Sequence, residues 1–274
     1  MRRYGFLFLI PTLLLPPGPP ELYAQDDDSD ARWIEQCQRD NDHGGDVTFC
    51  DVIVESVDAP GATISFDGGQ NGGVLYKGWE QERMEVHARI QAHGDTEAEA
   101  RDLARSIRFE IGPGGGRAIG PADDAEWTVV YYVHVPRRRN LEARANNGPL
   151  SAEGVTGTIR LETRNGPIHL SDVGGDVTAR AQNGPIGVKL GGSTWEGEGL
   201  DAETTNGPIS VSIPAGYAAT LETGTVHGPF DTEIPLQVTI QPGEEGRRLR
   251  VDLGGGGPLV RVVTTNGPVS IKSR

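Results

Sequence analysis

The side chains of this chain that could do chemistry do not group into familiar catalytic motifs. Its six histidines form no H-E-x-x-H arrangement and no Cys/His cluster, so their spacing predicts no zinc site. No serine stands in a G-x-S-x-G turn with a supporting histidine and acid. His87 and His134 fall in alternating runs, which favours half-exposed strand positions. The sequence therefore predicts no catalytic residue, no cofactor and no metal.

One acidic stretch has a second interpretation. DNDHGGDVTFCD, from Asp40 to Asp51, has aspartate at positions 1, 3 and 7 and glycine at position 6 of a loop of EF-hand length. It lacks the usual residues at positions 5 and 12, and no flanking helices are predicted. We expect a solvated loop, with calcium binding as the alternative.

The only two cysteines are Cys37 and Cys50. A pair this close in sequence, in a protein that leaves the cytoplasm, predicts one disulfide that closes a short loop. Two unpaired thiols are the alternative.

Residues 1–24 have the layout of a secretory signal peptide: a basic start, a short apolar run, and a small residue, Ala24, before an acidic stretch. The apolar run is shorter than the roughly 20 residues that span a bilayer. We therefore expect cleavage after Ala24, no integral membrane segment after signal removal, and an exported protein, periplasmic or extracellular.

The net charge of −14 restricts the partners. Such a chain repels phosphate backbones and anionic lipid surfaces, which excludes nucleic acid. The partner classes that remain are envelope polysaccharide and protein, and the oligomeric state is not predicted.

Two regions are expected before the repeats. Residues 25–45 are predicted to be an acidic flexible leader. Residues 46–139 contain alternating strand-like runs and form a β-rich capping region. Within it, TEAEARDLARSI at 96–107 predicts one short helix, because Thr96 and Glu99 have capping-box spacing before an apolar stripe.

Residues 140–274 are dominated by a repeat. Glycines recur every nine residues from Gly148, and the second and fourth residues after each glycine are apolar. This alternation predicts a short strand with one buried face in each unit. Every second unit carries N-G-P, so the full repeat is 18 residues with two strands and two corners. The corner residues predicted in this way are Asn147, Gly148, Asn165, Gly166, Asn183, Gly184, Asn206, Gly207, Gly228, Asn266 and Gly267.

A unit of this size cannot bury its apolar face alone, and stacking buries all the faces in one column. The repeat therefore predicts an all-β, β-helix-like solenoid, with an antiparallel sandwich as the alternative. Glycine is expected at the corners because it permits positive φ. Asparagines one repeat apart would stack and hydrogen-bond along the column, so we interpret them as structural.

The chain also resembles a known family through GGVLYKGWEQERMEV, the helix beginning TEAEA, EWTVVYYVHVPRRRNLEARANNGPL, the N-G-P-I units and GGSTWEGEGLDAETTNGPISVSIPAGYAATLET. It resembles the bacterial adhesin-like β-solenoid proteins of the domain-of-unknown-function family 4097, over roughly residues 60–274. The resemblance implies a right-handed, single-stranded β-solenoid in exported or envelope-linked proteins, and it brings no catalytic residues.

Together these observations predict an exported, non-enzymatic adhesin-like or scaffold protein of the bacterial cell envelope. Binding would use the outer face of the coils and the inserted loops near 190–202 and 231–258. One alternative is a carbohydrate-active enzyme, a polysaccharide lyase or hydrolase, which requires charged residues clustered in a groove across adjacent coils. Another is a protein-interaction module linked to envelope stress.

Overall fold

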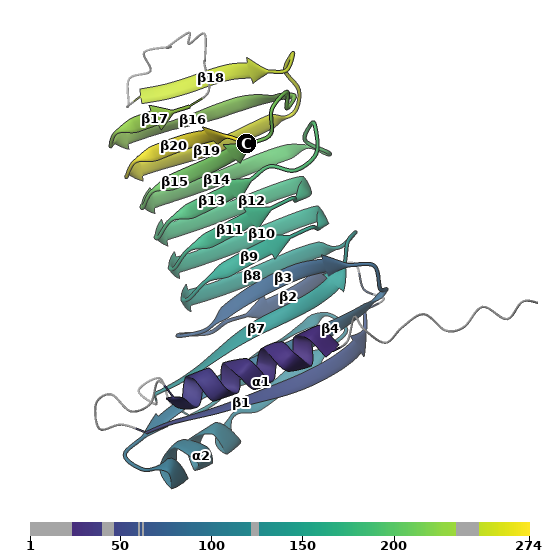
Figure 1. The fold of residues 1–274 in the computed structure, drawn as a ribbon, viewed down its shortest axis with the longest axis vertical. Helices are drawn as coiled ribbons and strands as arrows, with labels where there is room; N and C mark the ends of the chain where they lie inside the picture. The colour runs from purple at the N-terminus through teal and green to yellow at the C-terminus, as the bar shows by residue number, and fades with distance from the viewer. Residues whose placement is uncertain (1–23, 40–46, 60, 62, 122–125, 234–246) are drawn as a thin grey trace, which may run out of the picture.

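The computed structural model describes residues 24–39, 47–59, 61, 63–121, 126–233 and 247–274. These residues form two ten-stranded sheets and two helices, and the sheets pack face to face along one stack, with both helices at the N-terminal end (Figure 1). The molecule is therefore all-β, as the sequence predicts. The predicted signal peptide lies almost entirely outside the described residues.

The first sheet runs in the order β1 (Val47–Asp58), β4 (Arg83–Gly94), β7 (Trp127–Pro136), β3 (Gly73–Trp79), β9 (Leu150–Glu153), β11 (Ile168–Ser171), β13 (Ile186–Lys189), β15 (Ile209–Ile213), β20 (Val269–Ser273), β17 (Phe230–Thr232). The second runs in the order β18 (Arg247–Leu253), β16 (Ala219–His227), β19 (Leu259–Asn266), β14 (Gly199–Asn206), β12 (Gly174–Asn183), β10 (Thr156–Asn165), β8 (Asn140–Asn147), β2 (Thr63–Asp67), β6 (Gly115–Ile119), β5 (Arg108–Gly112).

Strands of the repeats pair in parallel, with the register that the repeat predicts. Thr156 of β10 pairs with Gly174 of β12, and Ile168 of β11 pairs with Ile186 of β13. From β8 to β15 the chain alternates between the two sheets, so each repeat adds one strand to each. Among the described strands, antiparallel pairs occur only toward the ends: β1 with β4, β4 with β7, β5 with β6, and β16 with β18.

The core is a set of apolar columns, because in-register parallel pairing places equivalent residues over one another. In the first sheet one column consists of Val74, Leu150, Ile168, Ile186, Ile209 and Val269. All six are at most 1% exposed. At roughly 25 cal/mol per Å² of apolar surface removed from water, such columns are the main stabilising term of the stack.

The corner glycines are required for a different reason from the one expected. Of the six predicted corner glycines, only Gly184 has a positive φ, 158°, which is nearly extended. Instead, a Cβ on Gly166 would lie 2.0 Å from the carbonyl oxygen of Gly148 in the neighbouring coil. Close approach of backbones, not left-handed conformation, therefore excludes a side chain at these corners.

The last coil does not stack last. β19 lies between β14 and β16 in the second sheet, and β20 lies between β15 and β17 in the first (Figure 1). Asn266 is thus paired with both Asn206 and His227. The irregular repeat spacings in this part of the sequence reflect a change in stacking order as well as inserted segments.

The predicted helix is present as α2 (Glu97–Ser106). Thr96 caps it, and its hydroxyl accepts a hydrogen bond from the backbone N–H of Glu99 at 3.3 Å. Its apolar stripe buries Ala100 and Ala104, and Ala104 belongs to the main core.

The prediction of a flexible leader at 25–45 is wrong for most of that segment. Residues Ala24–Arg39 form a helix, α1, that lies across β1 and β4 (Figure 1). Its sequence is too polar to predict a packed helix. Tertiary contacts hold it in place: the Cys37–Cys50 bridge, and bonds from Asp30 to the sheet.

Candidate functional site

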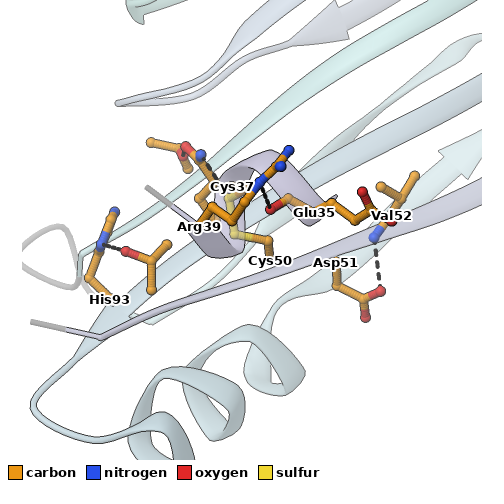
Figure 2. The surroundings of a disulfide bond; sticks show 10 residues. Glu35, Cys37, Arg39, Cys50, Asp51, Val52 and His93 are labelled. Carbon is orange, nitrogen blue, oxygen red and sulfur yellow. Dashed lines mark hydrogen bonds between the residues drawn. A yellow bond between two sulfur atoms is a disulfide. The ribbon is translucent and has the colours of Figure 1, made fainter. Parts of the chain in front are cut away.

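The predicted disulfide joins Cys37 of α1 to Cys50 of β1 (Figure 2). Gln91 of β4 donates a hydrogen bond to Cys37 Sγ at 3.2 Å, so the bridge sits on the sheet surface. Most of the acidic stretch considered for calcium lies outside the described residues. Its last member, Asp51, is exposed on β1 and accepts from the backbone N–H of Val52.

The corner asparagines form one continuous ladder. Each side-chain amide donates to the side-chain oxygen of the asparagine in the preceding layer, at 2.7–3.1 Å. In order of stacking, the ladder consists of Asn71, Asn147, Asn165, Asn183, Asn206 and Asn266. Asn71 is an addition that the 18-residue period did not indicate, because it precedes the repeats. The ladder thus joins successive layers by side-chain hydrogen bonds along one edge of the stack.

A second ladder lies just inside the first. The buried hydroxyls of Thr204 and Thr264 each donate to a glycine carbonyl of the preceding layer at 2.9 Å, and Thr163 does so at 3.3 Å. These bonds satisfy carbonyls at the corners where the backbones approach one another closely.

A shallow groove of about 550 Å³ crosses β8, β10, β12 and β14 near their C-terminal ends. We call it the cross-strand groove. The charged and amide side chains that line it are Arg144, Glu162, Arg164, Arg180, Gln182 and Glu203. In-register pairing aligns Arg144, Glu162, Arg180 and Glu203 in one row across four adjacent strands. The repeat thus builds a row of alternating charge along the stack.

A charged cluster adjoins the end of this row. Arg261 of β19 contacts Asp201 at 2.5 Å and Glu203 at 3.3 Å, and Arg180 also bonds to Asp201. Burial alone would raise the pKa of Asp201, but hydrogen bonds and the charges of Arg180 and Arg261 outweigh it and lower that pKa. Charged residues from adjacent layers therefore do converge, which the sequence did not indicate, since β19 comes from the last coil.

The inserted loops named as contact surfaces are only partly described. Trp195 in the 190–202 segment is buried, and its Nε1 donates to the Gly175 carbonyl at 3.1 Å. It packs against the stack and offers no exposed ring. In the 231–258 segment, residues 234–246 lie outside the described part of the chain.

A second cleft, of about 240 Å³, lies beside α1 on the outer face of the first sheet. Here Asp30 of α1 bonds to two residues of β4: its Oδ2 lies 2.5 Å from His87 Nδ1, and its Oδ1 accepts from Arg89 Nε at 2.8 Å. The Arg89 guanidinium also lies over the Tyr132 ring, at 4.1 Å from its centre.

His87 is 4% exposed, which differs from the half-exposed position expected for it. Burial lowers its pKa, but the hydrogen bonds and charges of Asp30 and Glu85 outweigh burial, and the pKa lies above its usual value.

Glu85, His87 and His134 converge beside this cleft, with one ligand-type atom from each within 4.8 Å of the others. Glu85 and His134 face each other in the antiparallel β4–β7 ladder, and His87 follows two residues after Glu85 on the same face. The sequence missed this group because the histidines are far apart in the chain and no short motif joins them. Only the register of β4 on β7 brings them together.

Within the described ranges, neither helix is both long and apolar enough to cross a bilayer.

No family model matches the chain, and none of the curated proteins does. Among solved structures, it is similar to a candidate cell adhesion protein from Clostridium sporogenes, with a TM-score of 0.40 and 11% identity, covering 82% of this chain and 100% of that one. A candidate adhesin from Bacteroides fragilis has a TM-score of 0.29 and 10% identity, with 82% and 97% covered. A candidate lipid-binding protein from Parabacteroides distasonis has a TM-score of 0.26 and 9% identity, with 84% and 97% covered. Scores this low establish neither a common fold nor a common activity.

Proposed function

We propose that this protein is an exported, non-enzymatic binding protein of the bacterial cell envelope, which holds polysaccharide in the cross-strand groove. The observation that carries the proposal is the row Arg144, Glu162, Arg180, Glu203, which repeats the same pair of charges along the stack.

The repeat matters because a linear polymer also repeats. Strands lie roughly 4.8 Å apart, so like charges in the row recur about every 10 Å along the groove. Arginine, glutamate and amide side chains donate to and accept from sugar hydroxyls. A polymer lying along the stack would therefore meet equivalent partners at successive layers, and several weak contacts would add to one useful affinity.

The state of the acids favours binding over hydrolysis. Glycosidases need one carboxylic acid whose pKa is raised, so that it can protonate the leaving oxygen. Asp201 has the opposite shift, and both Asp201 and Glu203 contact Arg261. The lowered pKa keeps Asp201 ionised, which suits it to accept hydrogen bonds from a ligand.

A carbohydrate-active enzyme is the second candidate, and one observation favours it. Arg180, Asp201, Glu203 and Arg261 are charged residues of adjacent layers gathered beside a groove, which is the feature such an enzyme requires. It would differ from a binding protein in releasing product from the bound chain.

Several finer features belong to the same proposal. We infer that the two sheets are successive faces of a right-handed, single-stranded solenoid of the domain-of-unknown-function family 4097, supported by the 18-residue parallel register. We also infer cleavage after Ala24 and a periplasmic or extracellular location, supported by the disulfide. Mass spectrometry of the protein recovered from its native compartment tests the cleavage, and a high-resolution experimental structure tests the handedness.

The test of function is a binding screen of the tag-free protein against envelope polysaccharides, with product release assayed in parallel. The variant R144Q/E162Q removes one exposed pair from the groove without changing net charge. Its matched control, E153Q/K189Q, makes the same neutral change on exposed residues of the first sheet.

We expect the groove variant to weaken binding at least tenfold and the control to leave it unchanged. If R144Q/E162Q binds as tightly as the parent protein, the polysaccharide site lies outside the cross-strand groove. Product release would favour the carbohydrate-active enzyme over the binding protein. Capture of an envelope protein without any glycan would instead favour the protein-interaction module.

A further inference from the structure

We propose that Glu85, His87 and His134 form a binding site for a divalent transition-metal ion, Zn²⁺, on the outer face of the first sheet. The site lies on different strands from the cross-strand groove, and it does not depend on the proposed glycan binding. Two imidazoles and one carboxylate are a ligand set that zinc takes in proteins.

The spacing of the ligand atoms suits the ion. Three ligands held at about 2.0–2.2 Å in tetrahedral geometry lie roughly 3.3 Å from one another. His87 Nε2 and Glu85 Oε1 are already 3.4 Å apart. All three ligand atoms lie within 4.8 Å of one another, so closing the site needs movements of about 1.5 Å or less.

Asp30 supplies the support that metal-binding histidines usually have. A ligand histidine typically uses its second ring nitrogen to bond a carboxylate, which fixes the ring and its tautomer. His87 Nδ1 lies 2.5 Å from Asp30 Oδ2, which leaves Nε2 directed at Glu85. The other Asp30 oxygen is bonded to Arg89, so the carboxylate itself is fixed.

The other two ligands are also held from outside. The Trp79 ring stacks on His134 at 5.1 Å between centres, and Trp79 Nε1 is fixed by the carbonyl of Arg83 at 2.9 Å. Glu85 Oε2 lies 3.5 Å from Arg83 Nη2, while Oε1 faces His87. Each of the three ligand residues is therefore held by contact with at least one neighbouring side chain.

The cleft beside α1 gives the site an open side. His87 and His134 line it, together with Lys77, Tyr132 and Glu153. Three protein ligands with space beside them leave a fourth position for water or a small anion. Because Asp30 comes from α1, the ion would also couple this helix to the sheet at a point distinct from the disulfide.

The experiment uses the tag-free protein with its disulfide intact, stripped of metal and titrated with Zn²⁺ at pH 8, because metal binding releases protons and is favoured at higher pH. We expect one zinc per chain, and Co²⁺ in its place should give visible absorption bands of a four- or five-coordinate site. E85Q and H134Q should each weaken binding at least tenfold, and the double variant should abolish it. The matched control H169Q changes an exposed histidine of β11 and should bind like the parent protein.

Asp30 is a positioning residue in this site, and D30N separates that role from simple loss of folding. It should weaken zinc binding 10- to 100-fold while the cobalt spectrum of the saturated protein keeps its bands.

A measurement on the parent protein tests the site without relying on variants that could fail to fold. In the parent protein labelled with ¹⁵N histidine, Zn²⁺ should shift the ring signals of His87 and His134 and leave those of His169 in place. No bound zinc, zinc that survives the E85Q/H134Q variant, or ring shifts at other histidines would each overturn the assignment.

Discussion

The N-terminal region and the repeats bury their residues in similar sheets but stabilise them by opposite means. In the repeats one contact is copied from layer to layer: the same apolar columns, the same asparagine bonds and the same close approach at the glycines. In the N-terminal region the decisive contacts occur once each, such as Asp30 with His87 and Cys37 with Cys50.

This difference has consequences for both stability and function. A copied contact is shared by its neighbours, so damage to one layer spreads to the adjacent layers. A unique contact fails locally, but it can build a site with several different side chains. The repeats therefore suit an extended binding surface, and the N-terminal region suits a compact site.

The largest loss of stability is expected when a side chain is placed at a corner. The Cβ of G166A would lie 2.0 Å from the Gly148 carbonyl oxygen, so the two layers must separate. We expect a loss of about 3 kcal/mol or more in the free energy of unfolding, measured with urea. The matched control G112A lies in the N-terminal region with no atom within 4 Å of the new Cβ, and it should be near neutral. Equal effects would show that close approach is not the reason for glycine.

The disulfide should act on one region alone. Replacing both Cys37 and Cys50 by alanine removes a cross-link worth about 3 kcal/mol in the chain-entropy picture. We expect hydrogen exchange in α1 to accelerate strongly, while amides of β10 and β12 keep their protection. Faster exchange throughout the stack would contradict a local role.

Removal of one member of the asparagine ladder should have a smaller effect that depends on its position. Asn183 donates to Asn165 and accepts from Asn206, whereas Asn71, at the start of the ladder, accepts from Asn147. At about 1 kcal/mol per bond, N183A should cost about twice as much as N71A in urea unfolding. Similar costs would mean that the second hydrogen bond of Asn183 adds no stability.

The smallest effect is expected from pH. The pKa of Asp201 is lowered in the folded protein, so its contribution is present above the unfolded pKa, near 4, and is lost as pH falls through the folded value. Thermal unfolding of the parent protein should therefore lose stability below about pH 4 more steeply than that of D201N. The difference should be modest, because the Asp201 side chain is 43% exposed and its bonds to arginine are screened by water. If the parent protein and D201N lose stability equally as pH falls, Asp201 does not contribute to the loss of stability in acid.

The sequence predicts the contacts of the repeats better than those of the N-terminal region, because only repeated contacts leave a pattern. A copied contact leaves a period, and the period places Asn165 over Asn147 without any further information. It does not determine the stacking order, because the units at Asn206, His227 and Asn266 offer similar faces. That is why the insertion of β19 beside β14 was not predicted.

Unique contacts leave no such pattern. α1 has few apolar residues, and its position depends on a disulfide and on Asp30, a single acid in an acidic segment. The Glu85, His87 and His134 group depends on the pairing of two strands separated by α2 and a hairpin. Neither could be read from local composition or spacing.

The interposed last coil has a consequence for the order of folding. β16 and β17 precede β19 and β20 in the chain, yet they reach the stack only through them. During synthesis from the N-terminus, the surface on which β16 and β17 will rest does not exist until β19 and β20 have emerged. Growth by successive addition can proceed as far as β15, and the remaining layers must wait for β19 and β20 and then assemble together. We therefore expect this end of the molecule to fold in a separate late phase, governed by long-range contacts, and removal of the last 16 residues to detach the preceding layer as well.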